Sequence, residues 1–296
     1  MLEPIFDAIQ GEATEYHAWT ASIVEATRRS FGASRVTFEL AHGTFGSSDI
    51  GPPSILRLVG HPSDDSTIVL SIVADSSREV VARNRSLLGE IEIHLENGVR
   101  LRRYPERIVG LLSAEGELLD GQPGWSASRL WSALVEGRAT LSKPSRRSAF
   151  YAVLDSPSSW SERRALSELE ARLVTLAAHG MTGKVLAYES GVSCSRVSHA
   201  LRRAAAKIGL LTSCELVRIA AGLGLEAPTR VDSGILTEAE REVVELVRSG
   251  LSNRAIADIR GRSPRTIANQ VASVLRKTTC PSRRALAAMR MYGTHG

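Results

Sequence analysis

Between Leu236 and Ala288 the apolar residues follow the spacing of four short amphipathic helices. In the third helix, Ile267, Val271 and Val274 recur at i, i+4 and i+7, which places them on one face. Polar and small residues occupy the opposite face, Ser273 among them. Residues suited to helix ends separate the four segments: Thr237 with Glu240, Gly250, Ser252 or Asn253, Gly261, Ser263 before Pro264, and Ser282. The pattern predicts a compact all-helical domain.

The same pattern occurs seventy residues earlier. Leu166–Ile219 aligns with Leu236–Met289 without a gap. The identical pairs are Leu166/Leu236, Glu168/Glu238, Glu170/Glu240, Val174/Val244, Leu176/Leu246, Gly180/Gly250, Ala187/Ala257, Gly191/Gly261, Ser193/Ser263, Lys207/Lys277 and Leu216/Leu286. Agreement at the helix boundaries indicates two copies of one small fold. Gly224 to Ile235 is expected to be a linker of about a dozen residues, which could span ~35 Å if extended.

Residues 1–154 mix helical and strand patterns. Val36, Phe38 and Leu40 alternate like a half-buried strand, and Thr67 to Ala74 is an apolar run suited to a central strand. A long helix is expected after Ser76, whose spacing to Glu79 suits a capping box. The remaining predicted elements are helices around Ile5 and Trp19, a hairpin over 108–119, a helix around Leu130, and a strand over 150–154.

The charge distribution separates the repeats from the rest of the chain. The formal net charge is +5, but residues 236–290 hold 11 Lys and Arg against 5 Asp and Glu, and residues 166–219 hold 7 against 4. The remainder is therefore negative. Basic repeats favour a nucleic-acid partner, while a solvated face explains the same charge without one.

Composition narrows the class of protein. There is no apolar run of membrane-spanning length and no signal-peptide pattern near residue 1, so a cytoplasmic location without membrane contact is expected. The three cysteines are unclustered and suit reduced thiols. We find no nucleophile elbow, phosphate-binding loop, dinucleotide fingerprint or metal-ligand cluster, so we predict no enzymatic activity, cofactor or metal. The HPSDD stretch at 61–65 is interpreted as a polar loop, and the arginines at 100, 102, 103 and 107 as a solvated helix end.

The second repeat resembles the LuxR/FixJ (GerE)-type helix-turn-helix. The matching residues are Leu236, Thr237, Glu240 to Val243, Gly250, Ser252, Asn253, Ile256, Ala257, Ser263, Thr266, Ile267, Lys277, Ser282 and Arg283. The resemblance implies that the third helix enters the major groove of DNA and that the fourth mediates dimer contacts. It places Ala268, Asn269 and Ala272 at base edges, and Arg265 and Thr266 at phosphates. Asn269 has reading chemistry of its own, because an amide can bond adenine bidentately. Ser252, Asn253, Arg254 and Arg276 complete the candidate DNA contacts.

Several positions depart from the family. Its members usually have apolar residues where Arg260 and Arg262 stand, and a histidine where Gln270 stands. They also have Lys in place of Ala268, and Leu-Gly in place of Thr278-Thr279. We therefore expect an atypical turn, an atypical helix end and an unusual DNA preference.

The first repeat resembles the family less closely. Its matches are Leu166, Ser167, Glu170, Gly180, Ser193, Val197, Leu201 and Lys207 to Leu210. Its candidate DNA contacts are Lys184, Ser195, Arg196, Ser198, His199, Arg202 and Arg203. The resemblance places Arg202 at a base edge, where arginine favours guanine. The alternative is that this copy is a structural or dimerising remnant.

Element order in residues 1–154 resembles a GAF-like unit leading into a PAS-like one. The predicted class is α+β, with a GAF-like sensory or dimerisation region at 1–104 and a PAS-like segment at 105–155. Two all-α four-helix LuxR-type domains follow at 163–223 and 233–291.

These observations predict a bacterial-type transcriptional regulator that binds promoter DNA. Its expected partners are double-stranded DNA, a small molecule or protein at the N-terminal region, and RNA polymerase. We expect a homodimer or an intrachain pseudo-dimer, with two recognition helices on adjacent half-sites. The rival interpretation is a protein-interaction regulator, in which one or both repeats bind a component of the transcription machinery instead of DNA.

Overall fold

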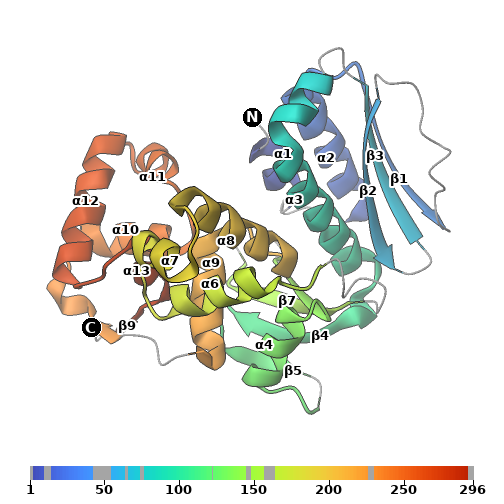
Figure 1. Cartoon of the computed structure of the whole chain (residues 1–296). Coiled ribbons are helices and arrows are strands. Elements are labelled where there is room, and N and C mark those ends of the chain that lie inside the picture. The colour runs from blue at the N-terminus through green and yellow to red at the C-terminus, as the bar shows by residue number, and fades with distance from the viewer. Residues whose placement is uncertain are drawn as a thin grey trace. The chain divides into compact units, whose positions relative to one another are not determined.

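The computed structural model describes residues 3–9, 15–42, 55–63, 66–73, 77–121, 123–144, 148–156, 164–225 and 230–292. The chain divides into two compact units. The first consists of Met1–Leu112, Asp120–Gln122 and Gly137–Arg164, and the second of Ser113–Leu119, Pro123–Glu136 and Ala165–Gly296. The mixed α and β content with helices toward the C-terminus confirms the α+β class (Figure 1). The four predicted domain boundaries stay predictions.

The first unit begins with helices on an antiparallel sheet. Helices α1 (Glu3–Ile9) and α2 (Tyr16–Phe31) precede β1 (Arg35–His42), β2 (Ile55–Ser63) and β3 (Ser66–Val73), and α3 (Ser77–Arg103) follows. The strand order β1-β3-β2 places the apolar run predicted to be central between its two neighbours. The three helices lie on one face of this sheet (Figure 1).

Trp19 lies at the centre of this helix and sheet packing. Its side chain is fully buried, and its indole N–H donates to the carbonyl oxygen of Ile9 at 2.8 Å. Gly98 of α3 makes room for the ring, since a Cβ there would lie 2.4 Å from Trp19 Cζ2. Apolar residues of α2, α3 and the sheet therefore share one core.

A second sheet with strand order β5-β4-β7-β6 contains β4 (Ile108–Ser113), β5 (Leu118–Gly121), β6 (Ala139–Ser142) and β7 (Phe150–Asp155). The predicted hairpin and closing strand are present, whereas β2 and β6 were not predicted. The short helix η2 (Pro105–Arg107) joins α3 to β4.

At the basic end of α3, the interpretation as a solvated surface was wrong for Arg100, whereas Arg103 is exposed and Arg102 and Arg107 are partly exposed. Arg100 is fully buried and donates to Thr140 Oγ1 at 3.1 Å. The guanidinium of Arg102 lies 4.6 Å from the centre of the Trp19 ring. These arginines hold α3 against neighbouring elements of the first unit. His61, Pro62 and Ser63 of HPSDD belong to the end of β2, so the predicted polar loop was wrong for them, and residues 64 and 65 lie outside the described residues, as does the expected Ser76 cap.

The second unit contains α4 (Ala127–Val135) and two sets of four helices. The first set is α6 (Glu168–Ala178), α7 (Gly183–Ser190), α8 (Cys194–Ile208) and α9 (Ser213–Ala220). The second set is α10 (Glu238–Arg248), α11 (Asn253–Arg260), α12 (Pro264–Lys277) and α13 (Arg283–Ala288). Helix starts in the two sets coincide under the seventy-residue shift, because matching serine and threonine residues cap them.

The described parts of the predicted linker, residues 224–225 and 230–235, form secondary structure. The π-helical turn η4 (Ala221–Leu225) continues α9, and η5 (Ser233–Ile235) leads into α10. Between them, β8 (Arg230–Asp232) pairs in parallel with β9 (Arg290–Tyr292), which follows α13. Within the described ranges, every helix is too short or too polar to cross a bilayer.

Candidate nucleic-acid interface

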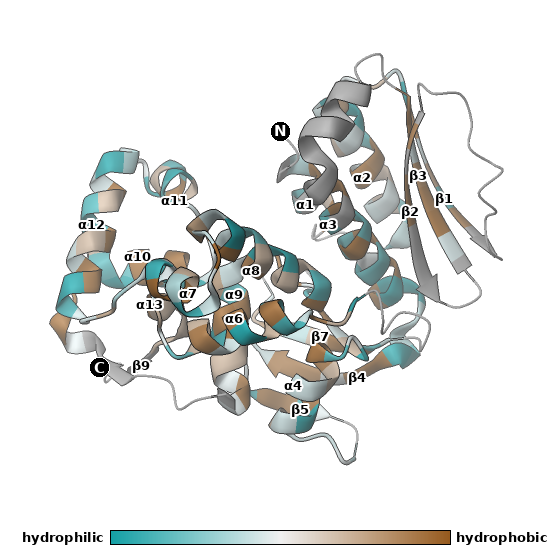
Figure 2. Cartoon of the chain, in the orientation of Figure 1, coloured by the Kyte–Doolittle hydropathy of each residue, from teal (hydrophilic) through white to brown (hydrophobic). Residues whose placement is uncertain are grey.

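Helix α12 presents one polar face and buries the other. Ser263 caps its start by accepting the Thr266 backbone N–H at 3.0 Å, and Pro264 occupies the first turn, where its missing N–H is harmless. Ile267 and Val274 are fully buried, and Val271 is nearly so. Figure 2 shows hydrophobic residues interspersed with hydrophilic ones along this helix. Burial of one stripe fixes which face remains available.

The available face carries most of the predicted contacts. Exposed residues on or beside α12 are Arg265, Thr266, Ala268, Asn269, Ala272 and Arg276. Ala268 and Ala272 are short, so they let a helix approach a partner closely, while Asn269 offers an amide donor and acceptor between them. Ser273 is different, because its hydroxyl donates to Glu240 Oε1 at 2.8 Å and anchors the helix.

A buried carboxylate ties α12 to the start of α10. Glu240 Oε2 accepts the Thr237 backbone N–H at 2.9 Å and the Lys277 ammonium at 2.7 Å. These hydrogen bonds, that of Lys277 above all, lower the pKa of Glu240 from 4.5 to about 2. A carboxylate that stays charged holds the end of α12 at a fixed distance from α10.

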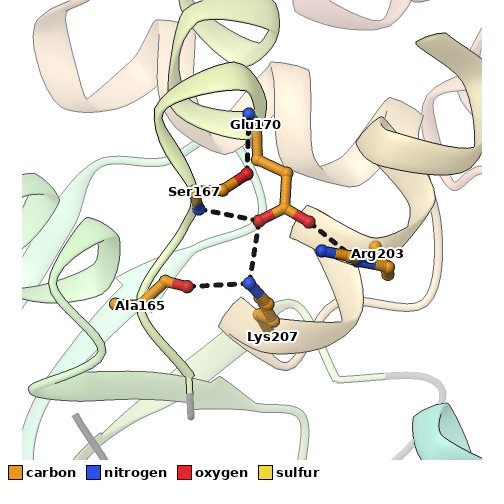
Figure 3. A network of polar contacts seen from close by, with 5 residues as sticks. All are labelled: Ala165, Ser167, Glu170, Arg203 and Lys207. Atoms are coloured by element: carbon orange, nitrogen blue, oxygen red, sulfur yellow. Dashed lines mark hydrogen bonds and ion pairs between the residues drawn. The ribbon is translucent and has the colours of Figure 1, made fainter. Parts of the chain in front are cut away.

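The first repeat contains the equivalent network (Figure 3). Glu170 Oε2 accepts the Ser167 backbone N–H at 2.8 Å and the Lys207 ammonium at 2.8 Å, and its Oε1 accepts from Arg203 Nε at 2.9 Å. Lys207 also donates to the Ala165 carbonyl at 2.8 Å. Sequence reasoning missed this role of the glutamate and lysine, although both are identical pairs with the same separation in each repeat.

Two residues at the start of α11, Ser252 and Asn253, make hydrogen bonds within the repeat. Ser252 accepts the Ala255 backbone N–H at 3.2 Å, so its hydroxyl is a helix cap. Asn253 Oδ1 accepts from Arg283 at 2.7 Å, and Arg283 also donates to the Leu251 carbonyl. Asn253 therefore joins the second helix to the fourth. Of the three residues predicted here, Arg254 is the exposed side chain that projects a charge.

Two departures from the family contact each other. Arg260 Nη1 donates to Gln270 Oε1 at 3.2 Å and to the Ala239 carbonyl at 3.2 Å. Its other terminal nitrogen lies 2.7 Å from Glu242 Oε2. Polar pairing thus joins the second helix to the first and third.

After the end of α12, Thr279 adopts the left-handed backbone conformation that glycine usually occupies. Thr279 has φ +54°, and its counterpart Gly209 has φ +95°. A β-branched residue in the left-handed region is strained by about 1–2 kcal/mol. Thr279 is the one described non-glycine residue with positive φ.

The corresponding face of α8 is also exposed. Ser195, Arg196, Ser198, His199 and Arg202 lie on it, and Lys184 is exposed on α7. Val197 and Leu201 are fully buried on the opposite side. Arg203 differs from the rest, because its ion pair with Glu170 gives it a structural partner.

The described residues also include thiols and potential metal ligands. Cys194, Cys214 and Cys280 are free thiols. In the parts of the chain that the structure describes, His, Cys, Asp and Glu side chains form no cluster of three that could hold a metal ion.

Residues 234–290 match the family of bacterial regulatory proteins described as the luxR family, GerE. The matched segment contains all of α10, α11, α12 and α13. No curated protein and no solved structure matches the chain. The match supports a DNA-binding regulatory domain at residues 234–290, and this family acts by regulation rather than by catalysis.

Proposed function

We propose that the chain is a sequence-specific transcriptional regulator that binds promoter DNA through α12. The observation that carries this proposal is the exposed face of α12 within the segment that matches the luxR family. Its buried stripe and the Glu240 anchor hold the helix in one orientation, as base reading requires. Asn269 would read a base edge, and Arg265 and Arg276 would contact phosphates.

The charge of the second repeat supports the same partner. Residues 236–290 have a surplus of six cations, and Arg254, Arg262, Arg265 and Arg276 are exposed. Neutralising phosphates releases condensed counterions, so binding would weaken steeply with salt.

We further propose that the N-terminal region senses a signal and controls DNA binding. One feature gives it a route to the repeats. The turn between β4 and β5 belongs to the second unit, and the carboxylate of Glu115 forms an ion pair with Arg248 at the end of α10. Gly116 contacts Gly222 so closely that a Cβ on Gly116 would lie 2.9 Å from the Gly222 Cα. The hairpin that carries this turn would transmit a change in the N-terminal region to α10.

To test DNA binding, the full chain is first used to select the DNA duplexes that it binds from a pool of random sequences. Asn269→Ala is expected to weaken binding to the selected duplex by about 1–3 kcal/mol and to leave binding to a scrambled duplex nearly unchanged. Arg241→Ala is the control, because Arg241 is exposed on α10 and not on α12. The assay is fluorescence anisotropy over a salt series.

Two results would contradict the proposal. An equal loss on selected and scrambled duplexes would make Asn269 a positioning residue without a reading role. Absence of duplex binding, together with salt-insensitive binding to RNA polymerase, would favour the protein-interaction regulator instead.

A further inference from the structure

The two repeats pack on each other through their fourth helices. Helix α9 contacts α13, and these two helices make the largest contact between the repeats. In addition α9 contacts α10, and α13 contacts α6. Each fourth helix therefore contacts the first and the fourth helix of the other repeat.

Individual residues show the same reciprocity. A Cβ on Gly250, which follows α10, would lie 2.4 Å from Thr212 Oγ1 at the start of α9. The counterpart Gly180, which follows α6, faces the start of α13, where the Ala285 Cβ would lie 3.8 Å from a Cβ on the glycine. The glycine after the first helix of each repeat thus contacts the beginning of the fourth helix of the other.

Reciprocal contacts identify the symmetry of the pair. When the same surface is used on both sides, the interface is isologous and the two partners are related by a two-fold axis. A head-to-tail tandem would join two unlike surfaces. The contacts between α6–α9 and α10–α13 are of the first kind, so α8 and α12 are related by an approximate two-fold axis.

This interface also occupies the fourth helices within one chain. Every residue of α9 from Cys214 to Ala220 is buried, and so is every residue of α13 from Ala285 to Ala288. A short amphipathic helix that is buried all around has no face left for another chain. A second chain could pair through these helices only by displacing the repeat already bound there.

We infer that a single chain is the unit that binds an operator, and that this operator is an inverted pair of two unlike half-sites. The inference rests on the proposed function, since it assigns a second reading helix to the same DNA. Two-fold related recognition helices bind inverted half-sites whose centres lie about 10–10.5 base pairs apart. The halves differ because Ser198, His199 and Arg202 stand where the second repeat has Ala268, Asn269 and Ala272.

The experiment is sequencing of the duplexes selected by the full chain, followed by mass photometry of the complex. The expected motif has two different halves in inverted orientation, and the complex contains one chain per duplex. Enrichment of one half alone would show that α8 does not read DNA. A direct repeat, or a palindrome bound by two chains, would also overturn the inference. Each of these three outcomes leaves the proposed function standing, whereas absence of any enriched duplex removes both.

Paired variants assign each half to its helix. Asn269→Ala is expected to relax selection in one half and Arg202→Ala in the other, each by a loss of about five-fold or more in preference. Arg172→Ala serves as the control, because Arg172 belongs to α6 and not to α8, and its guanidinium donates to the Glu189 carbonyl. Loss of preference in the same half for both variants would contradict the two-headed arrangement.

Discussion

The contact between Gly250 and Thr212 provides a direct test of the interface between the repeats. Gly250→Ala adds a methyl group that would lie 2.4 Å from Thr212 Oγ1 and 3.0 Å from its Cβ. Both distances are shorter than a van der Waals contact, so α9 or α10 must shift. Thr212 cannot rotate away freely, because its hydroxyl accepts the Glu215 backbone N–H at 3.1 Å and caps α9.

Gly261→Ala is the matched control for backbone strain. Gly250 and Gly261 both have positive φ, +81° and +58°, and both follow a helix of the second repeat. Alanine at either position costs about 1–2 kcal/mol for the left-handed conformation. A Cβ on Gly261 meets nothing within 4 Å, whereas overpacking at Gly250 adds about 1–3 kcal/mol. Gly250→Ala is therefore expected to destabilise the protein by about 1–3 kcal/mol more than its control.

A double-mutant cycle separates this clash from other effects. Thr212→Gly removes the atoms that collide, and glycine at a helix N-cap costs only a few tenths of a kcal/mol. In the Gly250→Ala background it should recover most of the excess loss. The measurement is urea unfolding followed by helical circular dichroism. Equal costs for the two alanine variants, or additive effects of Gly250→Ala and Thr212→Gly, would refute the packing of α10 on α9.

Two further predictions concern the start of α10 and the end of α12. Because the folded pKa of Glu240, about 2, lies below its ordinary 4.5, the stability it contributes is complete above pH 4.5 and is lost as the pH falls toward 2. Glu240→Gln should lower the free energy of unfolding by about 1–3 kcal/mol near neutral pH, measured by thermal unfolding. Glu238→Gln is the control and should change the free energy of unfolding little, because the Glu238 side chain is 87% exposed. Equal losses for the two variants would show that Glu240 does not anchor α12. Thr279→Gly should stabilise the protein by about 0.5–1 kcal/mol, because relief of the strained φ of +54° outweighs the additional conformational entropy that glycine loses on folding. Thr278→Gly should destabilise the protein, and a loss of stability at both positions would contradict the assigned backbone.

The sequence predicted helix ends better than it predicted contacts between helices. Helix caps such as Ser263 are local, because the side chain accepts a hydrogen bond from a backbone group three residues away. The seventy-residue repeat shows each helix start twice, which makes it easier to recognise in the sequence. The Arg100 side chain shows the limit. In the sequence, a cluster of arginines at a helix end is typical of a solvated surface. Only its packing against Thr140 shows that the Arg100 side chain is buried.

In the candidate site, too, the local pattern could be predicted from the sequence and the contacts between helices could not. The exposed stripe of α12 follows from the spacing of Ile267, Val271 and Val274, so the exposure of Asn269 could be predicted. Arg203 could not be separated from Arg202 by pattern, because both fall on the polar side of α8. The ion pair of Arg203 depends on Glu170, more than thirty residues away in the chain.

The two repeats share a glycine and a leucine where they contact each other, Gly180/Gly250 and Leu216/Leu286, and differ on the exposed faces of α8 and α12. On those exposed faces, His199 stands where the second repeat has Asn269. A homodimer has two identical recognition helices, so it reads both half-sites of an operator alike. It binds equally well when the protein is rotated by 180° about the two-fold axis of the operator. In the inferred arrangement, two unlike recognition helices in one chain would remove that equivalence, because exchanging them would place each on the wrong half-site. The inferred operator would therefore fix the orientation of the protein on DNA, and reversing only one half-site should abolish the cooperative contribution of the other.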